Sequence, residues 1–322
     1  MQIQDVFQRY GADLHQVETY MERHLEADVH LIPEIIHHIM TSGGKRFRPL
    51  LLLVASDLCG YGGKRRYPMA AVIEFIHTAT LLHDDVIDHA EMRRGKVSAN
   101  NIWGNAASVL VGDFLLATSF KLLSMEGNLP IMKLLSQTTT TMAEGEVFQL
   151  VKSHDLGITE REYLKIVEKK TAILISAACA VGALLAEAAE EEVAALTRFG
   201  MRLGSAFQIT DDTLDYLGNE EEFGKARGQD LKEGKITLPL IRTLKRCSAK
   251  EKNFIRTAVA KKDEAVFLEI VRLLQKYDGI EYALNKARTF IVEAKDYLKV
   301  FGDSEAKEAL FTICDYILCR RS

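Results

Sequence analysis

Apolar residues recur every three or four positions along most of this chain, which is the spacing of α-helices with one buried side. Strand-like alternation is nearly absent, and no proline falls between Pro130 and Pro239. We therefore expect an all-α protein, a single-domain bundle of long helices that spans residues 1–322. The expected helices cover residues 4–26, 32–41, 106–125, 131–151, 160–189 and 191–217, with another after Pro49 and shorter amphipathic helices toward the C-terminus.

A further apolar helix, after the polar segment 61–67, carries three aspartates. Asp84 and Asp88 are four residues apart, so a helix places them one above the other, with Asp85 about 100° round. Like charges at this spacing destabilise a helix by roughly 0.2–0.5 kcal/mol per pair. The negative end of the helix dipole adds to that cost, because Gly95 predicts that the helix ends soon afterwards. A divalent cation would offset the repulsion, and an all-oxygen site suits Mg²⁺.

The same DDxxD spacing returns near the end of the helix expected at 191–217. Asp211, Asp212 and Asp215 again follow an apolar stretch, and Gln208 precedes them by one turn. A single acidic motif is often only a solvated helix face. Two copies on two long apolar helices argue against that interpretation, so we expect a metal site formed by Asp84, Asp85, Asp88, Asp211, Asp212 and Asp215.

Four groups of basic residues lie beside glycines or at helix edges, where they could bind phosphate. They are Lys45, Arg46 and Arg48 after Gly43-Gly44; Arg93 and Arg94 after the first acidic motif; Lys169 and Lys170, followed by Thr171; and Lys225, Lys232 and Lys235 in or beside the loop 218–234. That loop also carries Asp230 and could close over an anion. A single lysine is more often a surface residue. The whole set predicts two anionic substrates, one a diphosphate bridged by Mg²⁺ to both acidic motifs and the other held by cations alone.

Composition and missing motifs narrow the function further. A net charge of −4 without a long basic run gives no nucleic-acid signature. The N-terminus has no apolar signal-peptide core, and the longest uncharged run, 171–186, is shorter than the ~20 residues of a membrane span. Five scattered cysteines without a CxxC pair indicate reduced thiols. We therefore expect a cytoplasmic protein without a transmembrane segment, and the absence of Rossmann, Walker and Ser-His-Asp patterns disfavours nucleotide chemistry.

Taken in order, these motifs resemble those of the trans-isoprenyl diphosphate synthases, and within them the long-chain polyprenyl group. The resemblance runs from GGKRFRPLL through IEFIHTATLLHDDVID, RRG, GNAASVLVGDFLL, AEGEVFQL, EKKTA and FQITDDTLDY to FGKARGQDLKEGKITLPLI. It implies the family's fold, a bundle of long helices around a deep central cavity, usually as a homodimer. It also implies the family's reaction, the Mg²⁺-dependent sequential condensation of isopentenyl diphosphate onto an allylic diphosphate such as farnesyl diphosphate.

Carried over position by position, the resemblance implies a role for each candidate. Asp84, Asp88 and Asp211 would bind metal, Asp85, Asp212 and Asp215 would complete the acidic motifs, and three Mg²⁺ ions would hold the allylic diphosphate, aided by Arg93, Lys170, Lys225 and Lys235. Isopentenyl diphosphate would be bound by Lys45, Arg48, His77 and Arg94. Oxygen atoms of Lys170, Thr171 and Gln208 would stabilise the allylic carbocation. The released diphosphate would accept the proton, so His77 would be a binding residue and not a base.

Product length would depend on the residues below the first acidic motif. Ala79 is five residues before Asp84, about 7.5 Å down the helix, and Thr80 is four before it. Both are small, whereas short-chain members of the family typically carry an aromatic residue at this level. An open tunnel and a long product are therefore expected, with Phe120, Leu123 and Leu135 as candidates for its floor. In the alternative interpretation, Ala79 merely packs against a neighbouring helix.

Other functions stay open at this point. A class I terpene cyclase uses a similar helical fold, but it binds one diphosphate and commonly has a different second metal motif. A non-catalytic partner in a hetero-oligomer would tend to lose its acidic motifs, which are intact here. A catalytic subunit that needs a small, dissimilar partner is compatible with the sequence. A structural scaffold would leave the acidic motifs without a purpose. Because a long product is very hydrophobic, transient membrane contact at its release is expected.

Overall fold

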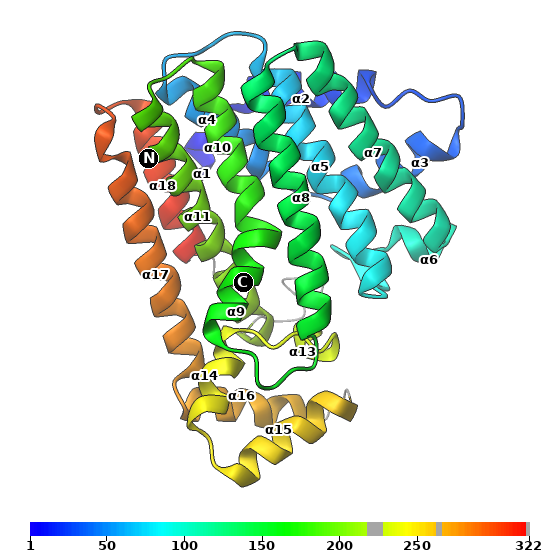
Figure 1. Cartoon of the computed structure of the whole chain (residues 1–322), viewed down its shortest axis with the longest axis vertical. Coiled ribbons are helices and arrows are strands. Elements are labelled where there is room, and N and C mark those ends of the chain that lie inside the picture. Colours follow the sequence, from blue (N-terminus) through cyan, green and yellow to red (C-terminus); the bar gives the residue numbers. More distant parts are fainter. Residues whose placement is uncertain (218–227, 262–265, 320–322) are drawn as a thin grey trace. The chain divides into compact units, whose positions relative to one another are not determined.

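The computed structural model describes residues 1–217, 228–261 and 266–319 (Figure 1). These residues are almost entirely helical and contain one short two-stranded hairpin, which confirms the all-α prediction. The chain divides into two compact units. The first unit comprises Met1–Thr139, Leu174–Gly200 and Tyr297–Ile313, and the second comprises Thr140–Ile173, Met201–Asp296 and Cys314–Ser322. That the chain folds as one domain stays a prediction.

Most helices belong to one unit, and a few run from one into the other. The first unit contains α1 (Ile3–Arg9), α2 (Gly11–Arg23), α3 (Leu31–Thr41), α4 (Phe47–Leu58), α5 (Arg66–Ile87), β1 (Met92–Arg93), β2 (Lys96–Val97), α6 (Ala99–Trp103), α7 (Asn105–Glu126) and η3 (Leu298–Val300). The second contains α9 (Glu160–Val167), η1 (Glu168–Ala172), α13 (Gln229–Lys232), α14 (Leu238–Arg246), α15 (Ala249–Lys261) and α16 (Phe267–Lys276). The helices α8 (Leu129–Lys152), α10 (Ile173–Leu185), α11 (Glu190–Leu217), α17 (Gly279–Tyr297) and α18 (Glu305–Cys319) contribute residues to both.

The helix α5 forms the centre of the first unit. Every residue from 68 to 76 is buried, and the helix packs against α2, α4 and α7 (Figure 1). A helix that is apolar on all sides is stable only when other elements cover it. This packing fixes the C-terminal end of α5, where the first acidic motif lies.

The prediction that the helix ends soon after the first acidic motif is confirmed, and the stretch after α5 is a hairpin. The helix ends at Ile87, and β1 pairs with β2 through Met92 opposite Val97. The two residues at the turn have positive φ angles, 50° at Arg94 and 78° at Gly95. Such a turn matches the twist of an antiparallel pair. Arg93 is therefore on a strand, and Arg94 is at the tip of the hairpin.

The bounds of two predicted helices need correction. The helix expected at 4–26 is two helices, α1 and α2, which meet at Tyr10. The helix expected at 160–189 contains one turn of π-helix, η1, and α10 ends at Leu185. A π-turn inserts an extra residue into a helix and is frequent at functional sites. This π-turn contains Lys170 and Thr171, two predicted site residues.

One described helix, α7, is long and apolar enough to cross a membrane by length and composition. In its most apolar window, 39% of the residues are buried inside the protein. A single helix of this kind is weak evidence for a membrane span, because core helices of soluble proteins meet the same criterion.

Candidate active site

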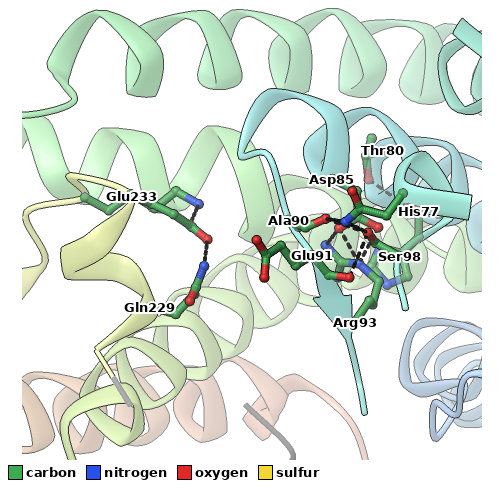
Figure 2. Close-up of polar contacts among 11 residues, drawn as sticks. His77, Thr80, Asp85, Ala90, Glu91, Arg93, Ser98, Gln229 and Glu233 are labelled. Carbon is green, nitrogen blue, oxygen red and sulfur yellow. Dashed lines mark hydrogen bonds and ion pairs between the residues drawn. The ribbon is translucent and has the colours of Figure 1, made fainter. Parts of the chain in front are cut away.

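The first acidic motif lies at the C-terminal end of α5 in the first unit. Asp84 and Asp88 are partly exposed, whereas Asp85 is 1% exposed. The Arg93 Nε atom donates to both carboxylate oxygens of Asp85, at 2.7 and 2.9 Å (Figure 2). Burial raises the pKa of Asp85, and the hydrogen bonds from Arg93 counteract that rise. Asp85 thus holds Arg93, while Asp84 and Asp88 are the carboxylates of this motif that reach solvent.

The hairpin that carries Arg93 and Arg94 is closed at its base by Ser98. The backbone N–H of Ser98 donates to the Glu91 carbonyl oxygen at 3.0 Å, and its hydroxyl donates to the Ala90 carbonyl oxygen at 2.5 Å (Figure 2). These two bonds fix the direction in which the strands leave the end of α5. The two arginines are therefore placed by backbone geometry.

The tip of the hairpin touches the glycine loop after α3. The Arg94 guanidinium donates to the Gly43 carbonyl oxygen. A Cβ atom on Gly44 would lie 2.7 Å from Arg94 Nη1, the mobile end of that side chain, and the φ angle of 153° at Gly44 favours glycine there. Lys96 Nζ donates to the Thr41 carbonyl oxygen at 3.1 Å. The structure thus brings the RRG and GGKRFRP motifs together within the first unit.

Arg46 serves this loop structurally. It has a φ angle of 47°, and its guanidinium makes ion pairs with Glu74 at 3.0 Å and Glu18 at 3.3 Å. Glu74 is 5% exposed. A buried carboxylate requires a partner of opposite charge, so this cluster fixes the start of α4. Arg48, two residues on, belongs to that helix.

Arg48 and Arg94 place positive charge beside His77. Burial lowers the pKa of Arg48 to about 10, with Glu74 opposing and Arg94 contributing. Burial also lowers the pKa of His77 well below its usual value, and Arg48 and Arg94 lower it further, so the imidazole is neutral. Within the part of the chain that the structure describes, the buried Arg48 Nε atom has no hydrogen-bond partner. An anion bound here would relieve the repulsion between the two arginines.

The second acidic motif lies on α11 in the second unit. Asp211 is exposed, whereas Asp212 is 6% exposed and accepts hydrogen bonds from the Tyr163 hydroxyl at 2.5 Å and Gln208 Nε2 at 2.6 Å. Burial raises the pKa of Asp212 to about 7; the two donors oppose the rise, and Asp211 and Asp215 add to it. Asp212 is therefore satisfied by neutral donors.

Asp215, the last residue of this motif, holds the segment that follows the loop. Its carboxylate accepts the backbone N–H groups of Gln229 at 3.1 Å and Asp230 at 3.2 Å. These donors lie at the start of α13, where free N–H groups favour a carboxylate. Across α13, Gln229 Nε2 donates to Oε1 of Glu233, the residue that follows the helix, at 2.6 Å (Figure 2). The second motif thus anchors the start of α13 by direct hydrogen bonds.

A cavity of ≈ 100 Å³ lies beside Asp212, entirely within the second unit. Its polar lining includes five predicted site residues: Lys170, Thr171, Gln208, Asp212 and Lys235. The Thr171 hydroxyl donates to Gln208 Oε1 at 2.7 Å. Ile158, Ile166 and Val167 supply an apolar part of the lining. Cationic, hydroxyl and amide groups beside apolar side chains suit a ligand with a charged head and a hydrocarbon tail.

The cavity also contains residues that the sequence analysis did not select as site residues. Tyr163 and Asp230 line it, and burial followed by repulsion from Asp215 and Asp212 raises the pKa of Asp230 well above its usual value. Glu146 makes an ion pair with Lys170 at 2.5 Å. Tyr163 precedes Lys170 by seven residues, two helical turns, so helical spacing could have found it.

The remaining predictions have mixed outcomes. Lys225 lies outside the described residues. Lys45, Arg48, His77, Arg93 and Arg94 belong to the first unit, and Lys170, Thr171, Gln208 and Lys235 to the second. The contacts given above therefore join residues of the same set. Among the described residues, no group of three or more His, Cys, Asp or Glu side chains could hold a metal ion by itself. Mg²⁺ commonly binds through one or two carboxylates and takes its other oxygens from water and phosphate, so this finding agrees with a substrate-bound ion.

The chain-length residues lie on α5, one turn or more below Asp84. Ala79 is fully buried, and the Thr80 hydroxyl donates to the His77 carbonyl oxygen at 2.8 Å (Figure 2). Of the three candidates for a tunnel floor, Leu123 and Leu135 are buried. Phe120, on α7, is 37% exposed, and its assignment to the floor stays a prediction.

Comparisons with known proteins extend these observations to the family. Residues 29–274 match the family model described as polyprenyl synthetase. The chain is 39% identical to octaprenyl diphosphate synthase of Escherichia coli (strain K12) over 311 residues, 96% of each chain. It is 36% identical to the all-trans-nonaprenyl-diphosphate synthase (geranyl-diphosphate specific) of Rhodobacter capsulatus over 318 residues, 98% of each chain. A crystal structure of a polyprenyl synthase from Caulobacter crescentus CB15, complexed with calcium and isoprenyl diphosphate, has a TM-score of 0.96 and 39% identity, covering 99% of this chain and 98% of that one.

The fold and the motifs therefore define a prenyltransferase with the all-α fold of the polyprenyl synthases. The chain belongs to the polyprenyl synthetase family, as a synthase of trans-polyprenyl diphosphates.

Proposed function

We propose that this enzyme makes a long-chain product, octaprenyl diphosphate, by adding isopentenyl diphosphate repeatedly to an allylic diphosphate such as farnesyl diphosphate. The observation that carries the long product is the small, fully buried Ala79 below Asp84. No aromatic side chain stands at this position or at Thr80, where it would stop a growing tail. The 39% identity to an octaprenyl diphosphate synthase supports the particular length, although a relative that makes a nonaprenyl product is 36% identical.

Isopentenyl diphosphate is bound in the first unit by Lys45, Arg48, His77 and Arg94. The buried Arg48 Nε atom, without a partner among the described residues, supports this assignment, because a diphosphate oxygen would supply the missing acceptor. His77 then acts as a neutral hydrogen-bonding group. The hydrogen bond from Arg94 to Gly43 holds the hairpin beside the glycine loop, so that both can contact the same diphosphate.

The allylic diphosphate is bound with Mg²⁺, which we propose to be three ions. Their ligands are Asp84 and Asp88 in the first motif and Asp211 in the second, all of which reach solvent. Asp85, Asp212 and Asp215 complete the motifs by holding Arg93, Tyr163 and α13. When bound, Mg²⁺ withdraws charge from the leaving diphosphate. Arg93, Lys170, Lys225 and Lys235 bind the same diphosphate, with Lys225 carried over from the sequence alone.

Cleavage of the allylic C–O bond leaves a carbocation, which the isopentenyl double bond attacks. Lys170, Thr171 and Gln208 line the cavity with oxygen atoms that stabilise positive charge. The hydrogen bond from Thr171 to Gln208 orients the amide. The released diphosphate then takes the proton that the new carbocation loses, so no side-chain base is needed.

The enzyme is proposed to be a cytoplasmic homodimer. Leu110 on α7 is 66% exposed, Phe120 is 37% exposed, and Ala117 between them is also exposed. Their spacing of seven and three residues puts them on one side of the helix, and an exposed apolar stripe of this kind is typical of a subunit interface. Leu110→Glu is expected to convert the dimer to monomer in sedimentation analysis, whereas an unchanged mass would reject this interface. Membrane contact would occur only transiently, at product release.

The decisive experiment is to incubate the purified chain with Mg²⁺, isopentenyl diphosphate and farnesyl diphosphate, and to determine product masses. A ladder that ends at the octaprenyl product is expected. Substrate binding that depends on metal, but without elongation, would indicate a missing partner subunit. Release of diphosphate with a cyclic hydrocarbon would indicate a terpene cyclase.

A further inference from the structure

The π-turn η1, which carries Lys170 and Thr171, is approached very closely by two neighbouring helices at glycines. On α8, a Cβ atom at Gly145 would lie 2.8 Å from Lys169 Cβ and 3.0 Å from the Lys170 backbone nitrogen. On α11, a Cβ atom at Gly204 would lie 2.6 Å from Ala172 Cα. Such distances leave no room for a side chain. The two helices therefore pack directly against the backbone of the π-turn at positions without a side chain.

The same two helices carry the partners of the two site residues. Glu146, next to Gly145 on α8, makes the ion pair with Lys170. Gln208, one turn after Gly204 on α11, accepts the hydrogen bond from Thr171. A shift of either helix away from η1 would lengthen one of these contacts. The register of both pairs is thus set by the glycine contacts.

The π-turn explains why this register matters. Lys170 and Thr171 both lie in this π-turn, and both line the cavity. One turn of π-helix changes the direction of successive side chains, but it is less stable than α-helix and needs support from its surroundings. Helices packed directly on its backbone provide that support.

We propose that Gly145 and Gly204 are positioning residues for the prenyl transfer reaction. They touch no substrate and act by holding η1 so that Lys170 and Thr171 face the cavity together. The inference rests on the proposed function, in which this cavity binds the allylic diphosphate.

The test compares Gly145→Ala and Gly204→Ala with a matched control, Gly200→Ala. Gly200 lies one turn before Gly204 on α11, and its Cβ atom would meet Ser176 Cα at the same 2.6 Å, with its three nearest atoms all in Ile175 and Ser176 of α10. All three variants are expected to lose thermal stability. The kcat per folded enzyme should fall about tenfold or more in Gly145→Ala and Gly204→Ala, because small displacements of catalytic groups have large effects on rate. The KM for the allylic diphosphate should rise while the KM for isopentenyl diphosphate stays within about twofold.

Gly200→Ala should keep kcat within about twofold of the wild type. If Gly145→Ala and Gly204→Ala behave like Gly200→Ala, with stability lost and kcat kept, the positioning role is overturned. Should Gly204→Ala fail to fold, Gly145→Ala decides, because its closest contact is a side-chain atom at 2.8 Å. The wild type is assayed for elongation first. Its failure to elongate would overturn the proposed function, and diphosphate release by the same variants would still test the positioning role.

Discussion

The two acidic motifs have the same spacing but bury their second aspartate in different ways. In the first motif, Asp85 is matched by a full positive charge on Arg93. In the second, Asp212 is matched by two neutral donors, Tyr163 and Gln208. Burial raises the pKa of both carboxylates, to about 7 for Asp212. The same pattern of residues thus holds an arginine in one place and a tyrosine and a glutamine in another.

The largest effect is expected when an aspartate that reaches solvent is neutralised. Asp84→Asn removes a proposed metal ligand, so kcat should fall by about 10³-fold and the Mg²⁺ concentration for half-maximal activity should rise. Steady-state kinetics at several Mg²⁺ concentrations measures both. Asp303→Asn, at a fully exposed carboxylate of the first unit, serves as the control and should change neither. Wild-type Mg²⁺ dependence in Asp84→Asn would mean that Asp84 is no ligand.

The level below each motif provides a second contrast. Four residues before the first aspartate, the second motif has the aromatic Phe207, and the first has Thr80. Ala79→Tyr adds an aromatic side chain below Asp84 and is expected to shorten the product to the farnesyl or geranylgeranyl level, as measured by mass. Ala79→Val, a small apolar control, should shorten it less. If Ala79→Tyr gives unchanged products, Ala79 lies outside the tunnel.

The third effect concerns stability and follows from the charge on Arg93. Asp85→Asn leaves a largely buried guanidinium without its counter-charge, and breaking a buried pair costs about 3 kcal/mol of unfolding free energy or more. Urea unfolding should show this loss. The double variant Asp85→Asn with Arg93→Gln should recover part of it, because no lone charge is then buried. A double variant less stable than Asp85→Asn would show that the ion pair between Asp85 and Arg93 is not what stabilises the end of α5 and the hairpin.

A smaller loss is expected in the second motif, where the partners are neutral. Asp212→Asn keeps the acceptor for Tyr163 and places an amide against Gln208, so the unfolding free energy should fall by only about 1 kcal/mol. The same urea series as for Asp85→Asn measures it. A loss as large as that of Asp85→Asn would remove the distinction between the motifs.

Much of the fold could be predicted because long, strongly periodic helices have clear signals. The predicted helix 106–125 is one residue shorter than α7 at each end, and the predicted helix 191–217 starts one residue after α11. The hairpin gave no such signal, since strands of two residues are too short to alternate. The break at Tyr10 lies inside a continuous amphipathic pattern. The π-turn depends on contacts with α8 and α11, which are far away in sequence.

The sequence motifs could also predict which residues gather at the site, but not which role each of them has. Spacing alone makes Asp84 and Asp85 equivalent, and only the folded chain shows that Arg93 engages one of them. Arg46 looked like a phosphate ligand beside Lys45 and Arg48. Its pairing with Glu74 depends on a helix that begins about twenty residues later in the sequence. Such roles come from tertiary contacts, which a motif does not encode.

The ion pair between Asp85 and Arg93 has a consequence for turnover. An elongating synthase must release one inorganic diphosphate for every unit that it adds. The Arg93 side chain is only 21% exposed in the folded chain, so in the proposed function diphosphate binding has little of its hydration shell to remove. Asp85 also keeps part of the guanidinium's attraction for itself, which weakens the hold on the leaving anion. We expect this balance to favour rapid clearance of diphosphate between additions.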